Sequence, residues 1–340
     1  MRRMLPYFLS TAALAQSWLP QQSGTSASLR GVSAVSEKVA WASGGEGTYL
    51  ETINGGKAWR AAKVPGAEAL DFRAVHGVDS RTAYLLSSGA GDKSRIYKTT
   101  DSGKNWTLQL TNPDPKGFYD ALAFWDATHG IVLGDPVDGH FAILTTGDGG
   151  GHWSQQQTPP ALPAEGAFAA SGSCLIVRGK SEAWFGTGGP KAARVFHSED
   201  GGQSWSTART PIRSDSASAG IFSLAFSEKQ YGIAVGGDYN KPKDRWRNIA
   251  ATADGGRTWD EPASVPPDGF RSAVAYLPDR HMWIAVGTSG SDYSANAGAT
   301  WLSIDNGAYN AVSFVPGKGW SHAAGWAVGP KGRIAKFQRP

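Results

Sequence analysis

An eight-residue pattern, Ser/Thr-x-Asp/Asn-x-Gly-x-x-Trp, recurs six times along the chain and restricts the possible folds more than any other motif. An Asp or Asn side chain can accept hydrogen bonds from the N–H groups of its own turn, and Gly adopts the positive φ that a tight turn needs. The Trp supplies a large face for packing between repeats. We therefore expect these residues to be structural and call the pattern the box. Its Asp or Asn and its Trp are Asn54 and Trp59, Asp101 and Trp106, Asp148 and Trp153, Asp200 and Trp205, Asp254 and Trp259, and Asn296 and Trp301.

The spacing of the boxes predicts a β-propeller. Successive box tryptophans lie between 42 residues (Trp259 to Trp301) and 54 residues (Trp205 to Trp259) apart, which is the length of a four-stranded blade. A short apolar run, such as Gly130-Ile131-Val132-Leu133-Gly134, recurs between the boxes and has the residue types of a strand. This run occurs seven times, one more than the box, so we predict seven blades, with six as the alternative.

The N-terminus supplies what the last repeat lacks. The chain ends after a seventh apolar run with no box and no outer strand, and Ser17-Trp18-Leu19-Pro20 resembles the segment that follows each box. We predict that this N-terminal strand completes the last blade and closes the ring, which removes exposed sheet edges. The expected fold is an all-β, seven-bladed propeller formed by residues 16–340 as a single domain. The high content of glycine (44) and tryptophan (14) agrees with many turns and aromatic packing.

The first 15 residues have the pattern of an export signal. Arg2 and Arg3 precede a short apolar stretch, and Ala13-Leu14-Ala15 has the small-x-small form of a cleavage site. We predict a signal peptide over residues 1–15 and a periplasmic or secreted location. The apolar stretch is too short to span a bilayer and no later segment is apolar enough, so we expect no integral membrane span after cleavage.

A binding site is expected where the channel of the propeller opens. The boxes join the third and fourth strands of each blade and lie on one face. The starts of the innermost strands and the loops between second and third strands lie on the other face, at the channel mouth. Polar residues there predict a site for an acidic peptide, a sugar or a protein loop, unless the arginines only line a water-filled channel. Arg178 is grouped with these candidates, which are Arg30, Arg73, Asp120, Asp135, Asp138, Asp238, Tyr239 and Arg271.

Motifs of catalysis and of nucleic-acid binding are absent. The sequence has no complete Gly-x-Ser-x-Gly, no phosphate-binding glycine loop and no His-x-x-x-His spacing, so we expect no catalytic residues, no metal and no cofactor. The formal net charge is +4 and the basic residues are spread along the chain, which argues against a nucleic-acid partner. These features favour a binding scaffold over an enzyme, and we expect a monomer.

The boxes resemble those of sialidases and other BNR-repeat glycosidases, where they are known as Asp boxes. Those enzymes bind the substrate carboxylate with three arginines, the first in a Phe/Tyr-Arg-Ile-Pro motif. Here Phe72-Arg73-Ala74-Val75 lacks the proline, and Phe270-Arg271-Ser272-Ala273 repeats its pattern in another blade. A glycoside hydrolase acting on extracellular glycans is the alternative function. Its candidate carboxylates are Asp120, Asp135, Glu165 and Asp238.

A closer resemblance is to the Ycf48/HCF136-like photosystem II stability and assembly factors. It rests on the seven-fold repeat, the Gly-Gly boxes, and the phrases Gly134-Asp135-Pro136 and Gly236-Gly237-Asp238-Tyr239, and it covers roughly residues 17–338. The resemblance implies an exported propeller that binds protein or peptide partners, an envelope or membrane protein among them. It also implies an arginine-rich binding surface and no catalytic role.

Overall fold

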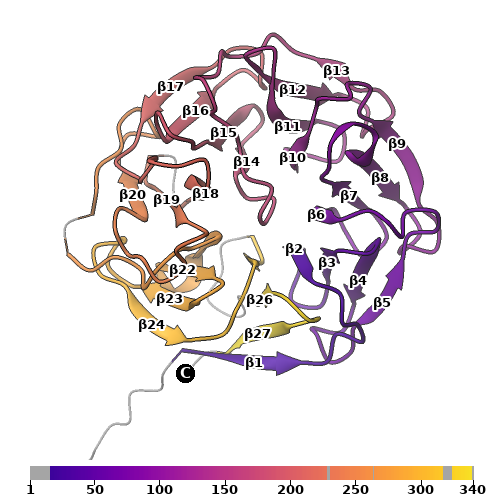
Figure 1. The fold of residues 1–340 in the computed structure, drawn as a ribbon. Helices are drawn as coiled ribbons and strands as arrows, with labels where there is room; N and C mark the ends of the chain where they lie inside the picture. Colours follow the sequence, from indigo (N-terminus) through magenta and orange to yellow (C-terminus); the bar gives the residue numbers. More distant parts are fainter. Residues whose placement is uncertain (1–15, 228–229, 263, 317–323, 339–340) are drawn as a thin grey trace, which may run out of the picture.

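Seven antiparallel sheets surround a central channel in the computed structural model, which describes residues 16–227, 230–262, 264–316 and 324–338 (Figure 1). Six sheets have four strands and one has three. The strands are β1 (Ser17–Gln21), β2 (Leu29–Ala34), β3 (Ala40–Gly44), β4 (Thr48–Thr52), β5 (Arg60–Lys63), β6 (Phe72–Gly77), β7 (Ala83–Ser87), β8 (Arg95–Thr99), β9 (Thr107–Thr111), β10 (Tyr119–Phe124), β11 (Gly130–Val137), β12 (His140–Thr146), β13 (Ser154–Gln155), β14 (Leu175–Arg178), β15 (Glu182–Gly186), β16 (Arg194–Ser198), β17 (Ser206–Arg209), β18 (Ala219–Phe226), β19 (Gly232–Asp238), β20 (Ile249–Thr252), β21 (Ala273–Leu277), β22 (Met282–Gly287), β23 (Gly290–Ser294), β24 (Leu302–Asp305), β25 (Ala311–Phe314), β26 (Gly325–Val328) and β27 (Ile334–Gln338).

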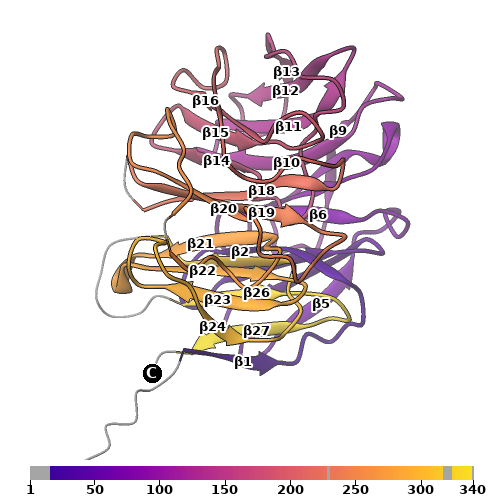
Figure 2. The ribbon, with the colours of Figure 1, turned by 60° about the vertical axis from the view of Figure 1, so that its left-hand side comes forward.

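The ring closes as the sequence predicts. The seventh sheet has the order β25-β26-β27-β1, in which the N-terminal strand pairs antiparallel with the C-terminal strand, from Ser17↔Gln338 to Gln21↔Ile334. Figure 2 shows β1 beside β27 at the outer edge of this sheet. The seven-bladed prediction is therefore confirmed, and the six-bladed alternative is wrong.

The boxes lie where the repeat predicts, between the third and fourth strands. In the second blade, Thr99 Oγ1 accepts a hydrogen bond from the Gly103 N–H (2.9 Å), and Asp101 Oδ1 accepts one from the Asn105 N–H (2.9 Å). The following Trp106 packs against Trp41 and Tyr49 of the preceding blade, with ring centroids 6.2 and 5.0 Å apart. Each box thus closes a hairpin and anchors one blade on its neighbour.

The described chain contains almost no helix. The two helical elements are short 3-10 turns, η1 (Gly91–Lys93) and η2 (Pro278–Arg280). Within the described ranges, no helix has the length and apolar character needed to cross a membrane. The predicted signal peptide, residues 1–15, lies outside the described residues.

The fourth blade carries a feature that the repeat does not predict: a segment before β14, residues 166–173, which reaches into the middle of the ring (Figure 1). We call it the plug. Ser171 Oγ donates to the carbonyl of Ser272 in the sixth blade (3.0 Å), and the carbonyl of Ala169 accepts a hydrogen bond from Arg73 in the second blade (3.2 Å). The plug therefore contacts the second and sixth blades from within the ring.

Candidate functional site

A pocket of about 450 Å³ opens at the mouth of the channel. It lies at the starts of the innermost strands, on the face opposite the boxes. The plug forms one side of it through Ala167, Phe168, Ala169 and Ala170. The remaining lining residues come from blades one, two, three, five, six and seven, and they are Arg30, Arg73, Phe118, Asp120, Asp135, Phe222, Tyr239, Phe270, Ser272, Thr288 and Asn310.

One structural position supplies six of these residues. In four blades the strand register shifts around a single residue at the start of the innermost strand. Such a bulge turns the extra side chain out of the ordinary alternation. The extra residues are Arg30, Arg73, Asp120 and Phe222, and the pairings Ala273↔Val286 and Ala311↔Val328 place Ser272 and Asn310 at the same position. Six of the seven blades thus point one residue from this position into the pocket, and its type differs from blade to blade.

Two arginines form the basic part of the pocket. Arg73 Nε donates to Asp71 Oδ2 (2.8 Å), while about a third of its side chain stays exposed. Arg30 is more deeply placed, and its Nε atom is buried without a hydrogen-bond partner among the described residues. Burial lowers the pKa of Arg30, as does the nearby Arg73, although Asp71 opposes them. A buried cationic group with an unused donor favours an anionic or carbonyl ligand.

Two carboxyl groups lie beside the arginines. Asp120 is fully buried, and its Oδ2 atom has no hydrogen-bond partner within the described part of the chain. Burial raises the pKa of Asp120 well above its ordinary value, and the Asp135 carboxylate raises it further, against a lowering effect of Arg73. Burial also raises the pKa of Asp135 to about 6, although its Oδ1 accepts a hydrogen bond from the Ala167 N–H (2.9 Å). The two carboxyl groups therefore share a site in which one proton is readily held.

The rest of the wall is aromatic. Phe168 of the plug stacks on Phe222, with ring centroids 3.9 Å apart, and Phe270 meets Phe222 edge to face at 4.7 Å. Tyr239 lies at the rim and is half exposed, 6.1 Å from Phe222. A pocket that combines fixed aromatic rings with a few converging polar groups is suited to a side chain or a short segment that has both apolar and polar parts.

The structure brings together five of the eight predicted site residues: Arg30, Arg73, Asp120, Asp135 and Tyr239. The other three do not line the pocket. Asp138 is in an exposed hairpin turn near Lys116 (3.5 Å). Asp238 is buried, and its carboxylate accepts hydrogen bonds from Ser218 Oγ (2.7 Å) and from the Asn240 N–H (3.0 Å), so it holds its own loop.

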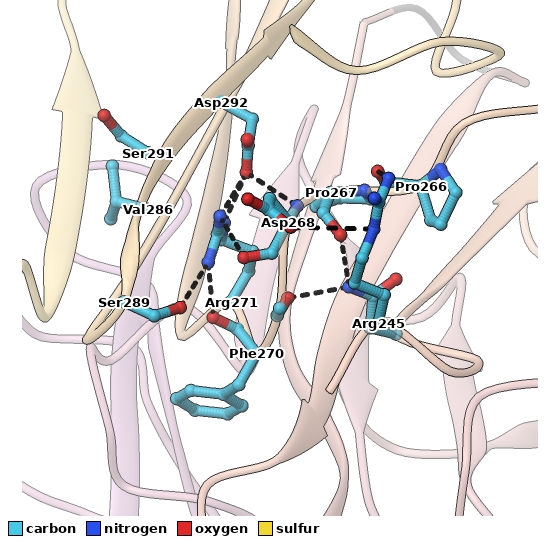
Figure 3. A network of polar contacts seen from close by, with 12 residues as sticks. Arg245, Pro266, Pro267, Asp268, Phe270, Arg271, Val286, Ser289, Ser291 and Asp292 are labelled. Carbon is cyan, nitrogen blue, oxygen red and sulfur yellow. Dashed lines mark hydrogen bonds and ion pairs between the residues drawn. The ribbon is translucent and has the colours of Figure 1, made fainter. Parts of the chain in front are cut away.

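Arg271 does not line the pocket, because it lies one residue before the pocket-facing position of the innermost strand in the sixth blade. Its N–H donates to Gly236 O in the preceding blade, as the N–H groups of Leu29 and Tyr309 do to Gly329 O and Gly287 O. Ser272, not Arg271, is therefore the equivalent of Arg73, and a slip of one residue sends a side chain to the other face of a strand. The guanidinium of Arg271 is buried, with Nε 2.6 Å from Asp292 Oδ2, and donates to Ser289 Oγ and two carbonyls (Figure 3).

Arg178 and Glu165, two further candidates from the sequence, make ion pairs and do not line this pocket. Arg178, grouped with the channel-mouth arginines, lies at the far end of β14, where it approaches Glu182 (3.6 Å) and the ring of Trp184. Glu165 is buried against Arg194 and accepts a hydrogen bond from Thr187 Oγ1 (2.6 Å). Of the four carboxylates considered for hydrolysis, only Asp120 and Asp135 line the pocket.

Sequence reasoning missed the aromatic wall and the plug. Aligning each first strand on the apolar run that follows it, rather than on its leading aromatic residue, would have brought Phe222, Ser272 and Asn310 into one column with Arg30 and Arg73. No repeat-based signal could have found Phe168, because the plug occurs in one blade only. The one group of three or more potential metal ligands among the described residues, Glu182, His197 and Glu199, lies outside this pocket.

Comparisons with known proteins bear on both the sequence and the fold. No family model matches the chain. The photosystem II assembly lipoprotein Ycf48 of Synechococcus sp. (strain CC9902) is 26% identical over 198 residues, which are 58% of this chain and 51% of that protein. The chloroplastic photosystem II stability/assembly factor HCF136 of Arabidopsis thaliana is 42% identical over 53 residues, 16% of this chain and 13% of that protein. The chain thus matches about half the length of the first relative and less of the second.

Two solved structures have the same fold. A structure of Ycf48 bound to a D1 peptide aligns with a TM-score of 0.65 at 18% identity, covering 95% of this chain and 97% of that one. Ycf48 from Cyanidioschyzon merolae aligns with a TM-score of 0.61 at 17% identity, covering 95% and 99%. The predicted resemblance is confirmed: the chain is similar in sequence, over part of its length, to the photosystem II assembly factors Ycf48 and HCF136, and it shares the fold of the solved Ycf48 structures.

Proposed function

We propose that this protein is an exported, non-catalytic propeller scaffold that binds a segment of a protein partner in the channel-mouth pocket. The observation that carries the proposal is the composition of the pocket: an unpartnered buried Arg30 donor beside the stacked rings of Phe168 and Phe222. Arginine and aromatic side chains in a fixed hollow are typical of peptide recognition. The complex of a structurally similar Ycf48 with a D1 peptide supports the same class of ligand.

The proposal includes the context of the binding. The predicted signal peptide over residues 1–15 supports a periplasmic or secreted location, and residues 16–340 would act as a single propeller domain. We propose a monomer whose partner is an envelope or membrane protein. Binding of a segment from such a protein during its assembly requires no chemistry at the pocket, only a fixed surface.

The test is fluorescence anisotropy with a labelled D1 peptide and with a set of peptides that combine acidic and aromatic residues. Phe222→Ala and Arg73→Gln should each weaken binding at least about tenfold, since truncating an anchor in a buried site costs 2 kcal/mol or more. Lys104→Gln removes an equal charge from an exposed box of the same blade as Arg73 and should leave the affinity unchanged. Equal loss in all three variants, or no saturable binding of any peptide, would contradict the proposal.

A glycoside hydrolase remains the second candidate because Asp120 and Asp135 line one pocket and influence each other's protonation. Paired carboxyl groups with one proton between them are what acid–base hydrolysis of a glycoside needs. A screen of glycans with the purified chain, compared with Asp135→Asn, tests this. Turnover that the variant loses would replace the scaffold proposal, and absence of turnover from the folded chain would remove the hydrolase.

A further inference from the structure

A second polar site lies at the opposite end of the fourth blade, away from the channel-mouth pocket. Its residues belong to neighbouring strands. The pairing of β15 with β16 sets Trp184 opposite His197 and Ala183 opposite Ser198, so Glu182 and Glu199 follow at the next step. Because side chains alternate along a strand, Glu182 projects from the same face of the sheet as Trp184 and His197, and Glu199 is the first residue after β16. The end of this hairpin thus carries an imidazole and two carboxylates.

These three side chains converge. One ligand atom from each of Glu182, His197 and Glu199 lies within 4.8 Å of the other two. They line a hollow of about 160 Å³, closed on its other side by Gln230, Asp254, Gly255 and Arg257 of the fifth blade. The hollow therefore lies between two blades and is large enough for an ion with its water ligands.

A second observation, independent of the two carboxylates, is that the His197 ring is buried and has a nitrogen without a hydrogen-bond partner among the described residues. Its side chain is nine-tenths buried, and its Nε2 atom has no hydrogen-bond partner among the described residues. The ring is stacked on Trp184, with centroids 4.4 Å apart and planes only 6° from parallel, and Trp184 is held by a hydrogen bond from its Nε1 to Gly255 O (2.9 Å). A buried imidazole nitrogen costs free energy unless something binds it, so a fixed and unpartnered nitrogen in a hollow indicates a missing ligand.

The charges around the hollow favour a cation. Carboxylate oxygens of Glu182 and Glu199 lie within 4.8 Å of each other, and like charges this close repel. Each glutamate has one described arginine within ion-pair distance: Arg178 Nε is 3.6 Å from Glu182, and Arg257 Nη2 is 3.9 Å from Glu199, with 70% of the Arg257 side chain exposed. Asp254 adds a third carboxylate to the lining. Three carboxylates thus face two arginines, and the pair that involves the exposed Arg257 contributes little, so a bound cation would offset the remaining negative charge.

We propose that Glu182, His197 and Glu199 form a binding site for a divalent transition-metal ion, with zinc as the probe of that class. An imidazole nitrogen with two carboxylates suits zinc and related ions, whereas calcium and magnesium prefer oxygen ligands alone. Three protein ligands leave at least one coordination position for water. The ion would join β15 to the loop after β16 and lie against the box of the fifth blade, so its direct effect is to stabilise the contact between these blades.

The experiment is a calorimetric titration of zinc chloride into the tag-free, chelator-treated chain. We expect one zinc ion per chain, with Glu182→Gln and Glu199→Gln each weakening the affinity at least about tenfold. Both substitutions lie at the partly exposed edge of the hollow and leave the His197–Trp184 stack in place. His152→Gln is the matched control, since His152 is an exposed box histidine that contacts Asp148 at 2.6 Å and could bind zinc adventitiously. It should leave the affinity unchanged.

A thermal readout separates binding at this site from binding elsewhere. Zinc should raise the unfolding temperature of the native chain and fail to raise that of Glu199→Gln. Calcium chloride at the same concentration should have no effect. The proposal would be overturned by no saturable zinc binding, by binding that survives both glutamate substitutions, by binding lost in His152→Gln, or by calcium binding as tightly as zinc.

Discussion

Trp18 donates its indole N–H to Ser291 Oγ at 3.0 Å, across a sequence separation of 273 residues. The ring of Trp18 also packs on Phe337 and Tyr309 of its own blade, with centroids 5.2 and 5.6 Å apart. It thus fills in the seventh blade the place that a box tryptophan fills in the others. The first strand of the chain holds the last blade to the sixth.

Removing this contact should weaken the whole ring. Trp18→Ala deletes a side chain that is 8% exposed, and we expect a loss of about 3–5 kcal/mol in the free energy of unfolding. Urea denaturation followed by tryptophan fluorescence measures it. Leu19→Ala, in the same strand but 46% exposed, should change the stability by less than about 1 kcal/mol. Similar losses in both variants would mean that β1 contributes only its backbone pairing.

Asp120 should make the protein less stable as the pH rises. Because its folded pKa lies above the value of about 4 expected in the unfolded chain, stability is greatest below that pH and falls as pH rises through the folded pKa. Asp120→Asn removes this loss and should stabilise the chain at pH 8 by about 1–3 kcal/mol, with a smaller gain at pH 5. Thermal unfolding at the two pH values tests it, with the exposed Asp138→Asn as the control. A variant that is less stable than the native chain at pH 8 would refute the expectation.

The plug has little room for added atoms at Gly172. This glycine has φ +76°, and a Cβ atom there would lie 2.8 Å from the Cβ of Ala74 in the second blade. Gly66 has nearly the same φ, +75°, with no atom within 4 Å. Gly66→Ala should therefore cost only the backbone strain, about 1 kcal/mol, and Gly172→Ala should cost about 1–3 kcal/mol more. Equal unfolding free energies for the two variants would show that the plug shifts to make room for the added methyl group at no cost in stability.

The box aspartates should tolerate asparagine but not alanine. Asp254 accepts hydrogen bonds from the Thr258 N–H (3.0 Å) and Oγ1 (2.7 Å) and from Thr252 Oγ1 (2.8 Å). Asn296 accepts the equivalent backbone bond from Thr300 (2.9 Å), so an amide oxygen suffices. Asp254→Ala should lower the free energy of unfolding by about 1 kcal/mol, as measured by denaturation, and Asp254→Asn by clearly less. An asparagine variant as unstable as the alanine variant would show that the charge matters.

The pKa of Asp254 leads to a prediction about stability at acidic pH. Burial tends to raise its pKa, but hydrogen bonds from Thr258 and Thr252 outweigh this and lower the pKa of Asp254 to about 2. A folded pKa below the unfolded value of about 4 gives stability that is present above pH 4 and lost as pH falls toward 2. The difference in unfolding temperature between the native chain and Asp254→Ala should therefore shrink between pH 5 and pH 2. If this difference in unfolding temperature stays constant over the pH range, it comes from packing and not from the charge of Asp254.

Much of the fold could be predicted because its defining contacts are local. The hydrogen bonds of a box are made within eight residues, so the turn chemistry of Asp101 or Asn296 can be read from the chain directly. The closing strand followed from the same logic, since Trp18 repeats the place of a box tryptophan. Repetition made each inference checkable against the other blades.

The pocket could be predicted only in part. The sequence predicts Arg30, Arg73 and Asp120 as pocket residues because they start innermost strands, but it also predicts Arg271, although Ser272 holds the equivalent position. One residue of register reverses which face a side chain occupies, and the paired strand rather than the local sequence decides that register.

The repeat, its seven-fold count and the closure of the ring can be read from the chain alone, because each rests on residues close together in the chain or on a motif repeated many times. The stacking of Phe168 on Phe222 of the adjacent fifth blade, and the position of Glu182 beside His197 in a hollow against that blade, depend on the folded ring. Those contacts join different blades or neighbouring strands, and their geometry depends on how the closed ring positions each blade. No local pattern along the chain encodes that arrangement.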